Sequence, residues 1–468
     1  MPTAFPRARI TPELLGLTAL SLLTHFWKLF SPAAVVFDEA YYEKFAGAYF
    51  THAFYFDVHP PLGNLMYAAL ARMLHVAPGI LSAPAPAPAL RVLPATFGTL
   101  AIPLVYIILT QLGVGRRIAT LGAAAILLDN ALLVDSRFIL LDTLLIGFGL
   151  AAIASYLASR DHPARSRLPF LALSAFLAGC GLSIKWTGSS ALAVILTTWF
   201  VACIRSRVDV RRFVVEGLIL VAIPVTIYCT SYAIHFSLLT HAGPGNTSMS
   251  PRFQSQLVGS PRYDPAAHMS YWAKMADVHH AIKYGNGGLE NATHPAASPW
   301  YTWPIMKHPF GFWEDAGTPP GTKTQILLLG NPVVWWGGLV GVLLGAAMIA
   351  RKRGRYEPHI YAIAFLAGAI AINYLPFAAI RRLVYLYHYL FALVFVVALA
   401  SVMLGIPAGW NDARGDSWSF PTRRSAAGYA AMLALLLVGF LYFLPFTYGW
   451  TMSLASWEAR FWVLHPHL

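Results

Sequence analysis

A short acidic stretch near the start of the chain could carry acid–base chemistry. Residues 37–65 read FDEAYYEKFAGAYFTHAFYFDVHPPLGNL and hold Asp38, Glu39 and Asp57, with His59 in a His-Pro-Pro turn. Only 11% of the chain is charged, and this stretch follows a hydrophobic run directly, where removing a carboxylate from water is costly. A carboxylate suits a general base that takes a proton from an attacking hydroxyl. The stretch is therefore a candidate site.

Basic side chains at the ends of other hydrophobic segments could join that site. Ionisable groups at membrane depth are costly and usually mark a functional site. Cations suit a phosphate group, whereas a carboxylate suits a base, so the combination suggests group transfer from a phosphate-linked lipid to a hydroxyl acceptor. The basic residues that we place on the same side as the acidic stretch are Arg91, Arg137, Lys185, Arg381 and Arg382.

The composition indicates an all-α polytopic membrane protein. Of 468 residues 57% are hydrophobic, and many segments reach the ~20 apolar residues that a membrane-spanning helix needs. The net charge of +13 fits residues that set topology and meet anionic lipid, so we expect no nucleic-acid partner. The predicted spans lie at roughly 11–30, 91–112, 118–134, 139–157, 168–184, 189–204, 213–233, 332–350, 359–375, 383–404 and 427–447.

Basic clusters between these segments predict the orientation. They lie at 113–117, 159–167, 204–212, 351–355 and 406–426, and all fall on one side of the membrane if there are about 11 spans. The positive-inside rule then places the N-terminus in the cytoplasm and the C-terminus outside. The acidic stretch consequently faces outward.

The same pattern divides the chain into three regions. Residues 1–233 form an N-terminal catalytic module of seven spans, with the acidic motif in its first outer loop, 31–90. Residues 234–331 form an extracytoplasmic loop with interfacial helices, because Trp and Tyr concentrate there as they do at water–lipid boundaries. Residues 332–468 form a four-span C-terminal region.

Several motifs, in this order, make the chain resemble the dolichyl-phosphate-mannose–protein mannosyltransferases, a family of the GT-C glycosyltransferase superfamily. FDE followed by DVHPPL at this distance is the most specific of them. The matching segments are FDE (37–39), DVHPPLG (57–63), LRVLPATFGTLAIPLVY (90–106), SRFILLD (136–142), IKWTG (184–188), HPAASPWYTWP (294–304), NPVVWW (331–336) and NYLPF…YLYHY (373–389). The resemblance implies a GT-C-type helical bundle.

The resemblance also implies catalytic roles for the acidic pair, Asp38 and Glu39. Asp38 would activate a Ser or Thr hydroxyl, which displaces the lipid phosphate from the anomeric carbon with inversion. Glu39 would pair with Arg91 and hold the loop against the following span. Asp142 is expected to take a similar structural pairing.

The remaining candidates fall into two groups. Asp57, His59, Pro60 and Pro61 would shape the loop and the acceptor side, because prolines fix the backbone. Side chains expected to bind the donor phosphate are Arg137, Lys185, Arg381 and His388. We expect no metal ligands and no certain cofactor, although an accessory divalent cation stays open, because the histidines lack tight ligand spacing.

Three departures from the family pattern point to a bacterial member. Asn64 replaces a Lys that usually follows the HPPL motif, and Ala40-Tyr41-Tyr42 replaces a His-containing version. The 234–331 loop is too short for the β-trefoil MIR domain of eukaryotic members, so no MIR domain is expected. These features suggest a polyprenyl-phosphate donor and a multi-pass protein of the bacterial inner (plasma) membrane, with its active site facing the periplasm.

The first hypothesis is an inverting transferase that moves mannose, or a similar hexose, from polyprenyl phosphate to Ser/Thr hydroxyls of exported proteins. A second keeps this chemistry with a lipid acceptor, as in the lipid A aminoarabinose transferases. A third, a lipid transporter or flippase, would favour ionisable residues near mid-membrane and repeated halves, and neither pattern is present in the sequence. The oligomeric state stays open.

Overall fold

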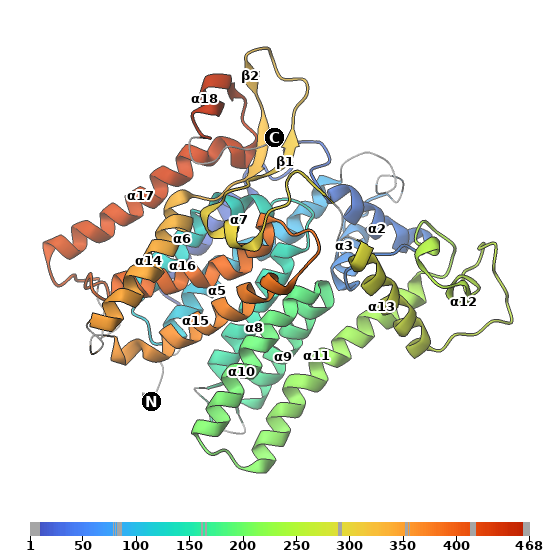
Figure 1. The fold of residues 1–468 in the computed structure, drawn as a ribbon, viewed down its shortest axis with the longest axis horizontal. Helices are drawn as coiled ribbons and strands as arrows, with labels where there is room; N and C mark the ends of the chain where they lie inside the picture. Colours follow the sequence, from blue (N-terminus) through green and yellow to red (C-terminus); the bar gives the residue numbers. More distant parts are fainter. Residues whose placement is uncertain are drawn as a thin grey trace.

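The computed structural model describes residues 10–461 except 78, 80, 82–86, 161, 164–165, 289–292, 352–353, 355 and 412–417. Parts of three basic clusters, 159–167, 351–355 and 406–426, therefore lie outside the described residues, as do the basic residues at the N-terminus. The described chain folds into a helical bundle with short loop helices and small strands at one end (Figure 1).

Each of the predicted spans contains a helix. These helices are α1 (Pro12–Phe26), α5 (Val92–Gln111), α6 (Arg116–Leu127), α8 (Asp142–Ser159), α9 (Leu168–Ile184), α10 (Ser189–Arg205), α11 (Val210–Leu238), α14 (Pro332–Arg351), α15 (Ile360–Tyr374), α16 (Leu390–Gly405) and α17 (Arg423–Tyr448). By length and composition, eight helices of the described chain could cross a membrane, and α9 is a shorter apolar helix.

Burial separates the centre of the bundle from its edge. In the most apolar stretch of Leu386–Gly405, which includes α16, 94% of residues are buried. The corresponding share is 78% for α8 and 17% for α11. Helices α8 and α16 therefore form the centre of the bundle, and α11 and α17 lie at its periphery, as Figure 1 also shows. The exposed apolar surface of the peripheral helices fits contact with lipid.

The third predicted span is interrupted, because α6 ends before a buried carboxylate at Asp129. Asp129 caps the next short helix by accepting a hydrogen bond from the Leu132 amide at 2.9 Å. Its second oxygen accepts from the Asn331 amide at 3.0 Å and from Trp335 Nε1 at 2.8 Å. These bonds join two distant parts of the chain and satisfy the buried carboxylate.

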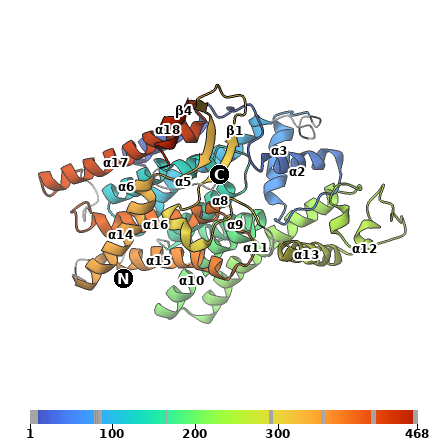
Figure 2. The ribbon, with the colours of Figure 1, turned by 45° about the horizontal axis from the view of Figure 1, so that its top comes forward.

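Short elements gather at one end of the bundle, which we call the loop end, where segments 31–90 and 234–331 lie (Figures 1 and 2). The α-helices outside the bundle are α2 (Glu39–Thr51), α3 (Leu62–Met73), α7 (Asn130–Asp135), α12 (Pro251–Gln254), α13 (Tyr271–Gly288) and α18 (Leu454–Glu458). Short 3₁₀ helices include η1 (Pro88–Arg91), η2 (Trp186–Gly188), η4 (Trp300–Ile305), η7 (Leu375–Ala379) and η8 (Leu386–Tyr389).

Two small antiparallel sheets add to the helical architecture that the sequence predicts. Strand β1 (Phe310–Glu314) pairs with β3 (Gln325–Leu328), and β2 (Thr322–Lys323) pairs with β4 (Met452–Ser453). Strand β1 buries alternate aromatic residues, which is the pattern of a half-buried strand. The pairing of β2 with β4 joins the segment after α17 to the loop that follows β1 (Figure 2).

Candidate active site

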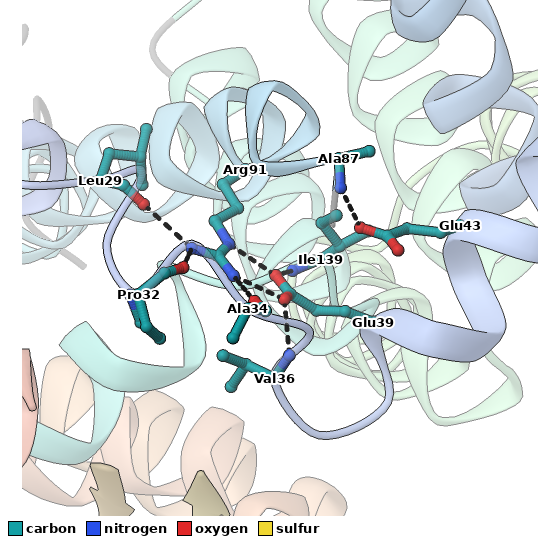
Figure 3. Close-up of polar contacts among 9 residues, drawn as sticks. All are labelled: Leu29, Pro32, Ala34, Val36, Glu39, Glu43, Ala87, Arg91 and Ile139. Carbon is teal, nitrogen blue, oxygen red and sulfur yellow. Dashed lines mark hydrogen bonds and ion pairs between the residues drawn. The ribbon is translucent and has the colours of Figure 1, made fainter. Parts of the chain in front are cut away.

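Glu39 and Arg91 form a fully buried ion pair beneath the acidic stretch (Figure 3). Both side chains are 0% exposed. Arg91 donates through Nε at 2.8 Å and through Nη2 at 2.7 Å, one bond to each carboxylate oxygen. The same oxygens accept from the backbone amides of Ile139 at 3.0 Å and Val36 at 2.9 Å. With four donors, Glu39 is saturated and cannot also act on a substrate.

Arg91 also ties down the segment that leads into the acidic stretch. It donates to the carbonyl oxygens of Pro32 and Ala34, each at 2.8 Å (Figure 3). This pairing is the one that the family resemblance implies, and the carbonyl bonds extend it to the backbone. A buried ion pair is tolerated only where further hydrogen bonds satisfy both partners, and that condition is met.

Asp38 stands at the start of α2, and its carboxylate accepts no hydrogen bond from the part of the chain that the structure describes. It occupies the N-cap position, yet its side chain makes no capping hydrogen bond. Burial raises the pKa of Asp38 to about 6, Lys185 opposes this rise, and Asp142 adds to it. A carboxylate with that pKa is a stronger base than an ordinary aspartate and is still largely ionised at neutral pH.

Phe37 fixes the backbone just before Asp38. Its φ of 49° lies in the left-handed region, and its amide donates to the Phe312 carbonyl at 3.2 Å. The ring stacks on Phe312 at 4.9 Å and meets Phe310 edge-on at 4.7 Å. Strand β1, more than 270 residues further along the chain, therefore helps to set the position of Asp38. The FDE motif alone does not predict this contact of Phe37 with β1.

Lys185 and Asp142 form a second ion pair close to Asp38. Lys185 Nζ donates to the two oxygens of Asp142 at 2.9 and 3.0 Å, and both residues are buried. The pairing matches the structural role expected for Asp142. Lys185 Nζ also lies 5.3 Å from the centre of the Tyr387 ring. The ammonium group is thus held in place by a carboxylate on one side and an aromatic face on the other.

A cavity of about 370 Å³ reaches this ion pair from between α8, α10, α15 and η8. Most of its lining is apolar, and the polar residues among those that line it include Asp142, Trp186, Ser190, Asn373 and His388. An apolar groove with a few convergent polar groups is the usual form of a small-molecule site. Trp186 directly follows Lys185 in IKWTG, and Asn373 opens the NYLPF motif, so both could have been singled out from the sequence.

The DVHPPLG segment forms a tight turn. Asp57 accepts from the His59 amide at 3.1 Å and from Asn64 Nδ2 at 2.9 Å, which anchors the start of α3. Pro60 and Pro61 are buried, and Pro61 is the N-cap of α3. Burial raises the pKa of Asp57 to about 6, and hydrogen bonds from Asn64 and the backbone oppose that rise.

His59 lies near the cationic part of the site. Burial lowers the pKa of His59, and the nearby Lys185, Arg382 and His388 lower it further. The imidazole is therefore neutral at physiological pH. Among the described residues, no group of three His, Cys, Asp or Glu side chains could hold a metal ion.

Arg137 does not fit the phosphate-binding role expected from the sequence. The side chain is 1% exposed, and its guanidinium donates to the carbonyls of Trp27 at 2.7 Å and Lys28 at 2.9 Å. It also lies 4.4 Å from the centre of the Tyr448 ring. Arg137 therefore caps the carbonyl end of α1, where a cation is favourable, and its two Nη groups donate to backbone carbonyls. It is absent from the lining of the cavity.

The last two phosphate candidates are placed differently from each other. Arg381 is exposed and is absent from the cavity lining, whereas its neighbour Arg382 is half-buried. His388 lines the cavity, with its ring stacked on Tyr387 at 4.5 Å. The site therefore brings together Asp38, Lys185, Asp142 and His388, with His59 beside them, and leaves Arg137 and Arg381 outside.

The overall fold is that of the GT-C membrane glycosyltransferases. It matches a chain of the Saccharomyces cerevisiae protein O-mannosyltransferase Pmt1–Pmt2 complex bound to the sugar donor, with a TM-score of 0.85 and 16% identity over 98% of this chain and 94% of that chain. An archaeal oligosaccharyltransferase from Archaeoglobus fulgidus matches with a TM-score of 0.54 and 13% identity, over 96% and 57% of the two chains.

Two family models identify the family more closely. Residues 16–240 match the model of dolichyl-phosphate-mannose-protein mannosyltransferases, and residues 271–465 match the C-terminal four-span region of protein O-mannosyltransferases. Together the two matches cover most of the sequence. The chain belongs to the protein O-mannosyltransferase family.

Curated relatives agree with this assignment. Protein O-mannosyl-transferase 1 of Danio rerio is 34% identical over 271 residues, which are 53% of this chain and 37% of that protein. Dolichyl-phosphate-mannose–protein mannosyltransferase 4 of Saccharomyces cerevisiae is 29% identical over 70% of this chain and 47% of that protein. The matched region thus spans less than half of the length of these relatives.

Proposed function

We propose that the chain is an inverting glycosyltransferase that moves mannose, or a similar hexose, from a polyprenyl-phosphate donor to Ser or Thr hydroxyls of exported proteins. One observation carries the proposal: Asp38 has an unused carboxylate beside the Lys185–Asp142 pair, where an apolar cavity ends. The cavity suits the lipid part of the donor, and the charged groups suit the bond that must break.

In this mechanism Asp38 acts as the general base. The acceptor hydroxyl attacks the anomeric carbon on the face opposite the phosphate, and its proton passes to the Asp38 carboxylate. A new carbon–oxygen bond forms as the bond from the sugar to the phosphate oxygen breaks, and the phosphate leaves with the electron pair. Configuration is inverted, because one displacement takes place on the side away from the leaving group.

Lys185 is our candidate for stabilising the negative charge that develops on the phosphate. The ammonium group is already held by Asp142, so it costs little reorganisation when the charge forms. His388 reaches the same cavity and can contribute a hydrogen bond. Arg137 is withdrawn from this role, and Arg381 has no contact that supports it.

On the acceptor side we assign a shaping role to the turn of Asp57, His59, Pro60 and Pro61. Asn64 is buried in that turn and donates to Asp57, so it anchors the carboxylate without adding a charge. The family pattern has a Lys there, which would add a cation. Lys185 then becomes the main cation that acts on Asp57, and its charge lowers the pKa of that carboxyl.

We also propose the cellular setting that the departures from the family pattern suggest. The protein is a bacterial member in the inner membrane, with the loop end facing the periplasm. The catalytic module is 1–233, the extracytoplasmic loop is 234–331, and the four-span region is 332–468. The two family matches, 16–240 and 271–465, support a similar division.

The test uses purified full-length protein, radiolabelled polyprenyl-phosphate mannose and separate peptide and lipid acceptors. We expect label on Ser/Thr peptides, and we expect Asp38→Asn to lower transfer by orders of magnitude while the thermal unfolding temperature stays close to wild type. Asp264→Asn, an exposed change at the same end, is the matched control. Normal turnover in Asp38→Asn would show that Asp38 is not the general base. Label found only on lipid would favour the second hypothesis, in which the acceptor is a lipid.

A further inference from the structure

A second groove, separate from the catalytic cavity, lies between α2, α3 and the last turns of α11. Its volume is about 550 Å³. Figures 1 and 2 show α2 and α3 lying together near that end of α11. The walls are apolar, and Arg72 is the only charged residue among those that line it. The walls include Phe50, Leu65, Ala69, Ile234 and Leu238.

Exposed apolar side chains surround the groove. Ile234 and Leu238 belong to a helix that is long and apolar enough to cross a bilayer, and Ile234 is 44% exposed. Next to Arg72, Met73 is 75% exposed and Leu74 is 46% exposed. Exposed apolar side chains on both walls indicate that lipid, not water, meets the mouth of the groove.

Arg72 is placed as a head-group contact. Its side chain is exposed at the end of α3, and no ion pair joins it to an acidic residue anywhere in the described part of the chain. An arginine at the edge of the bilayer extends toward the head groups and attracts anionic lipid. An apolar groove that ends at a cation matches the shape and charge of a lipid with an acyl chain and an anionic head group.

We propose that this groove binds an anionic phospholipid of the outer leaflet, with one acyl chain between α3 and α11 and its phosphate at Arg72. The groove shares no lining residue with the catalytic cavity and contains no carboxylate, so it is a binding site and not a second reaction site.

The bound lipid would brace the helices that carry the acidic motif. Tyr49 lines the groove, and its hydroxyl is hydrogen-bonded to the Tyr55 hydroxyl at 2.7 Å and to His235 Nδ1 at 2.8 Å. Tyr55 lies two residues before Asp57 in the sequence. An acyl chain packed against Tyr49 therefore stabilises the segment around Tyr55, which leads into the turn of Asp57.

The experiment is photo-crosslinking of the full chain in phosphatidylcholine nanodiscs that contain a trace of phosphatidylglycerol with a diazirine on its acyl chain. We expect the label to concentrate on α3 and the end of α11. Excess unlabelled phosphatidylglycerol should compete for the groove, and excess phosphatidylcholine should not. Catalytic turnover is not needed for this readout, so its outcome is independent of the proposed function.

Three variants sharpen the test. Ala69→Trp fills the groove and should abolish labelling of α3, and Ile234→Trp fills it from the opposite wall if the first variant does not fold. Arg72→Gln should lower phosphatidylglycerol labelling about fivefold, whereas Arg252→Gln, an exposed arginine outside the groove, should not change it. Labelling spread evenly over the lipid-facing helices, equal labelling by a phosphatidylcholine probe, or full labelling of the filled variants would overturn the proposal.

Discussion

Replacing Glu39 by Gln should let the segment around Asp38 leave its position against Arg91 while the helical bundle stays folded. Each oxygen of Glu39 accepts two hydrogen bonds, one from Arg91 and one from a backbone amide. Whichever oxygen becomes the NH₂ group of Gln then faces two donors, and Arg91 loses its counter-charge in a site that is 0% exposed. Removing one partner of a buried ion pair costs about 3–5 kcal/mol.

This cost should mainly destabilise the position of the loop around Asp38, because the other contacts of the bundle are unchanged. If the whole cost disfavours the state with Asp38 in place, the equilibrium constant for that state falls by about two to three and a half orders of magnitude, at tenfold per 1.4 kcal/mol. The initial rate of mannose transfer should fall with the fraction of molecules in that state, and the main thermal transition in detergent should shift little.

A double-mutant cycle isolates the pair. Glu39→Gln and Arg91→Met should each lower the rate strongly, and the double variant should lose less than the sum of the two in free energy, because no unpaired charge stays buried. The control cycle is Glu314→Gln with Lys323→Met. That ion pair measures 3.4 Å with Glu314 52% exposed, so its coupling should be about 0–1 kcal/mol. Additive losses in the first cycle, or wild-type turnover in Glu39→Gln, would refute the assignment.

Three further predictions concern the groups around Asp38. Because burial raises the pKa of Asp38 to about 6, the rate of transfer should fall as the pH drops through about 6, where the base becomes protonated. A rate that does not change from pH 5 to 8 would contradict this prediction. Lys185→Gln should lower kcat by about 10²–10³, and Lys185→Arg should restore part of it. Arg137→Gln should instead lower the unfolding temperature more than the turnover of folded protein. The reverse pattern would assign phosphate binding to Arg137 and a structural role to Lys185. Phe37→Ala should lower kcat at least about tenfold, and Phe37→Tyr, which keeps the stacked ring, should not; equal rates would dismiss β1 as a support of Asp38.

The parts predicted from the sequence are those that depend on residue type within one segment. Hydrophobic runs of the right length located the bundle helices, because desolvating a backbone in lipid requires a helix. The ion pair of Glu39 with Arg91 followed from motifs that the family resemblance supplied. The break at Asp129 was missed, because an apolar run on both sides hides a carboxylate whose partners, Asn331 and Trp335, lie 200 residues away.

Differences between the expected and the observed contacts at the site arise where residue type does not specify a partner. Arg137 and Lys185 look alike in the sequence, since each is a cation at the end of a span. The fold directs Arg137 to the carbonyls that end α1 and directs Lys185 to Asp142, and only the three-dimensional path of the chain decides between these partners. For the same reason the contact of Phe37 with β1 could not be predicted.

The geometry also explains why two carboxylates stand side by side at the start of α2. A base that was positioned by its own hydrogen bonds would be stabilised in its ionised form, and its pKa would fall. Here Glu39 accepts all four positioning bonds, while Asp38, one residue earlier, makes no capping bond and keeps a raised pKa. The first carboxylate can stay basic because the second one holds the backbone. This division of roles requires adjacent residues whose side chains point in different directions, and it predicts that exchanging them, as Asp38→Glu with Glu39→Asp, should lose activity even though the net charge is unchanged.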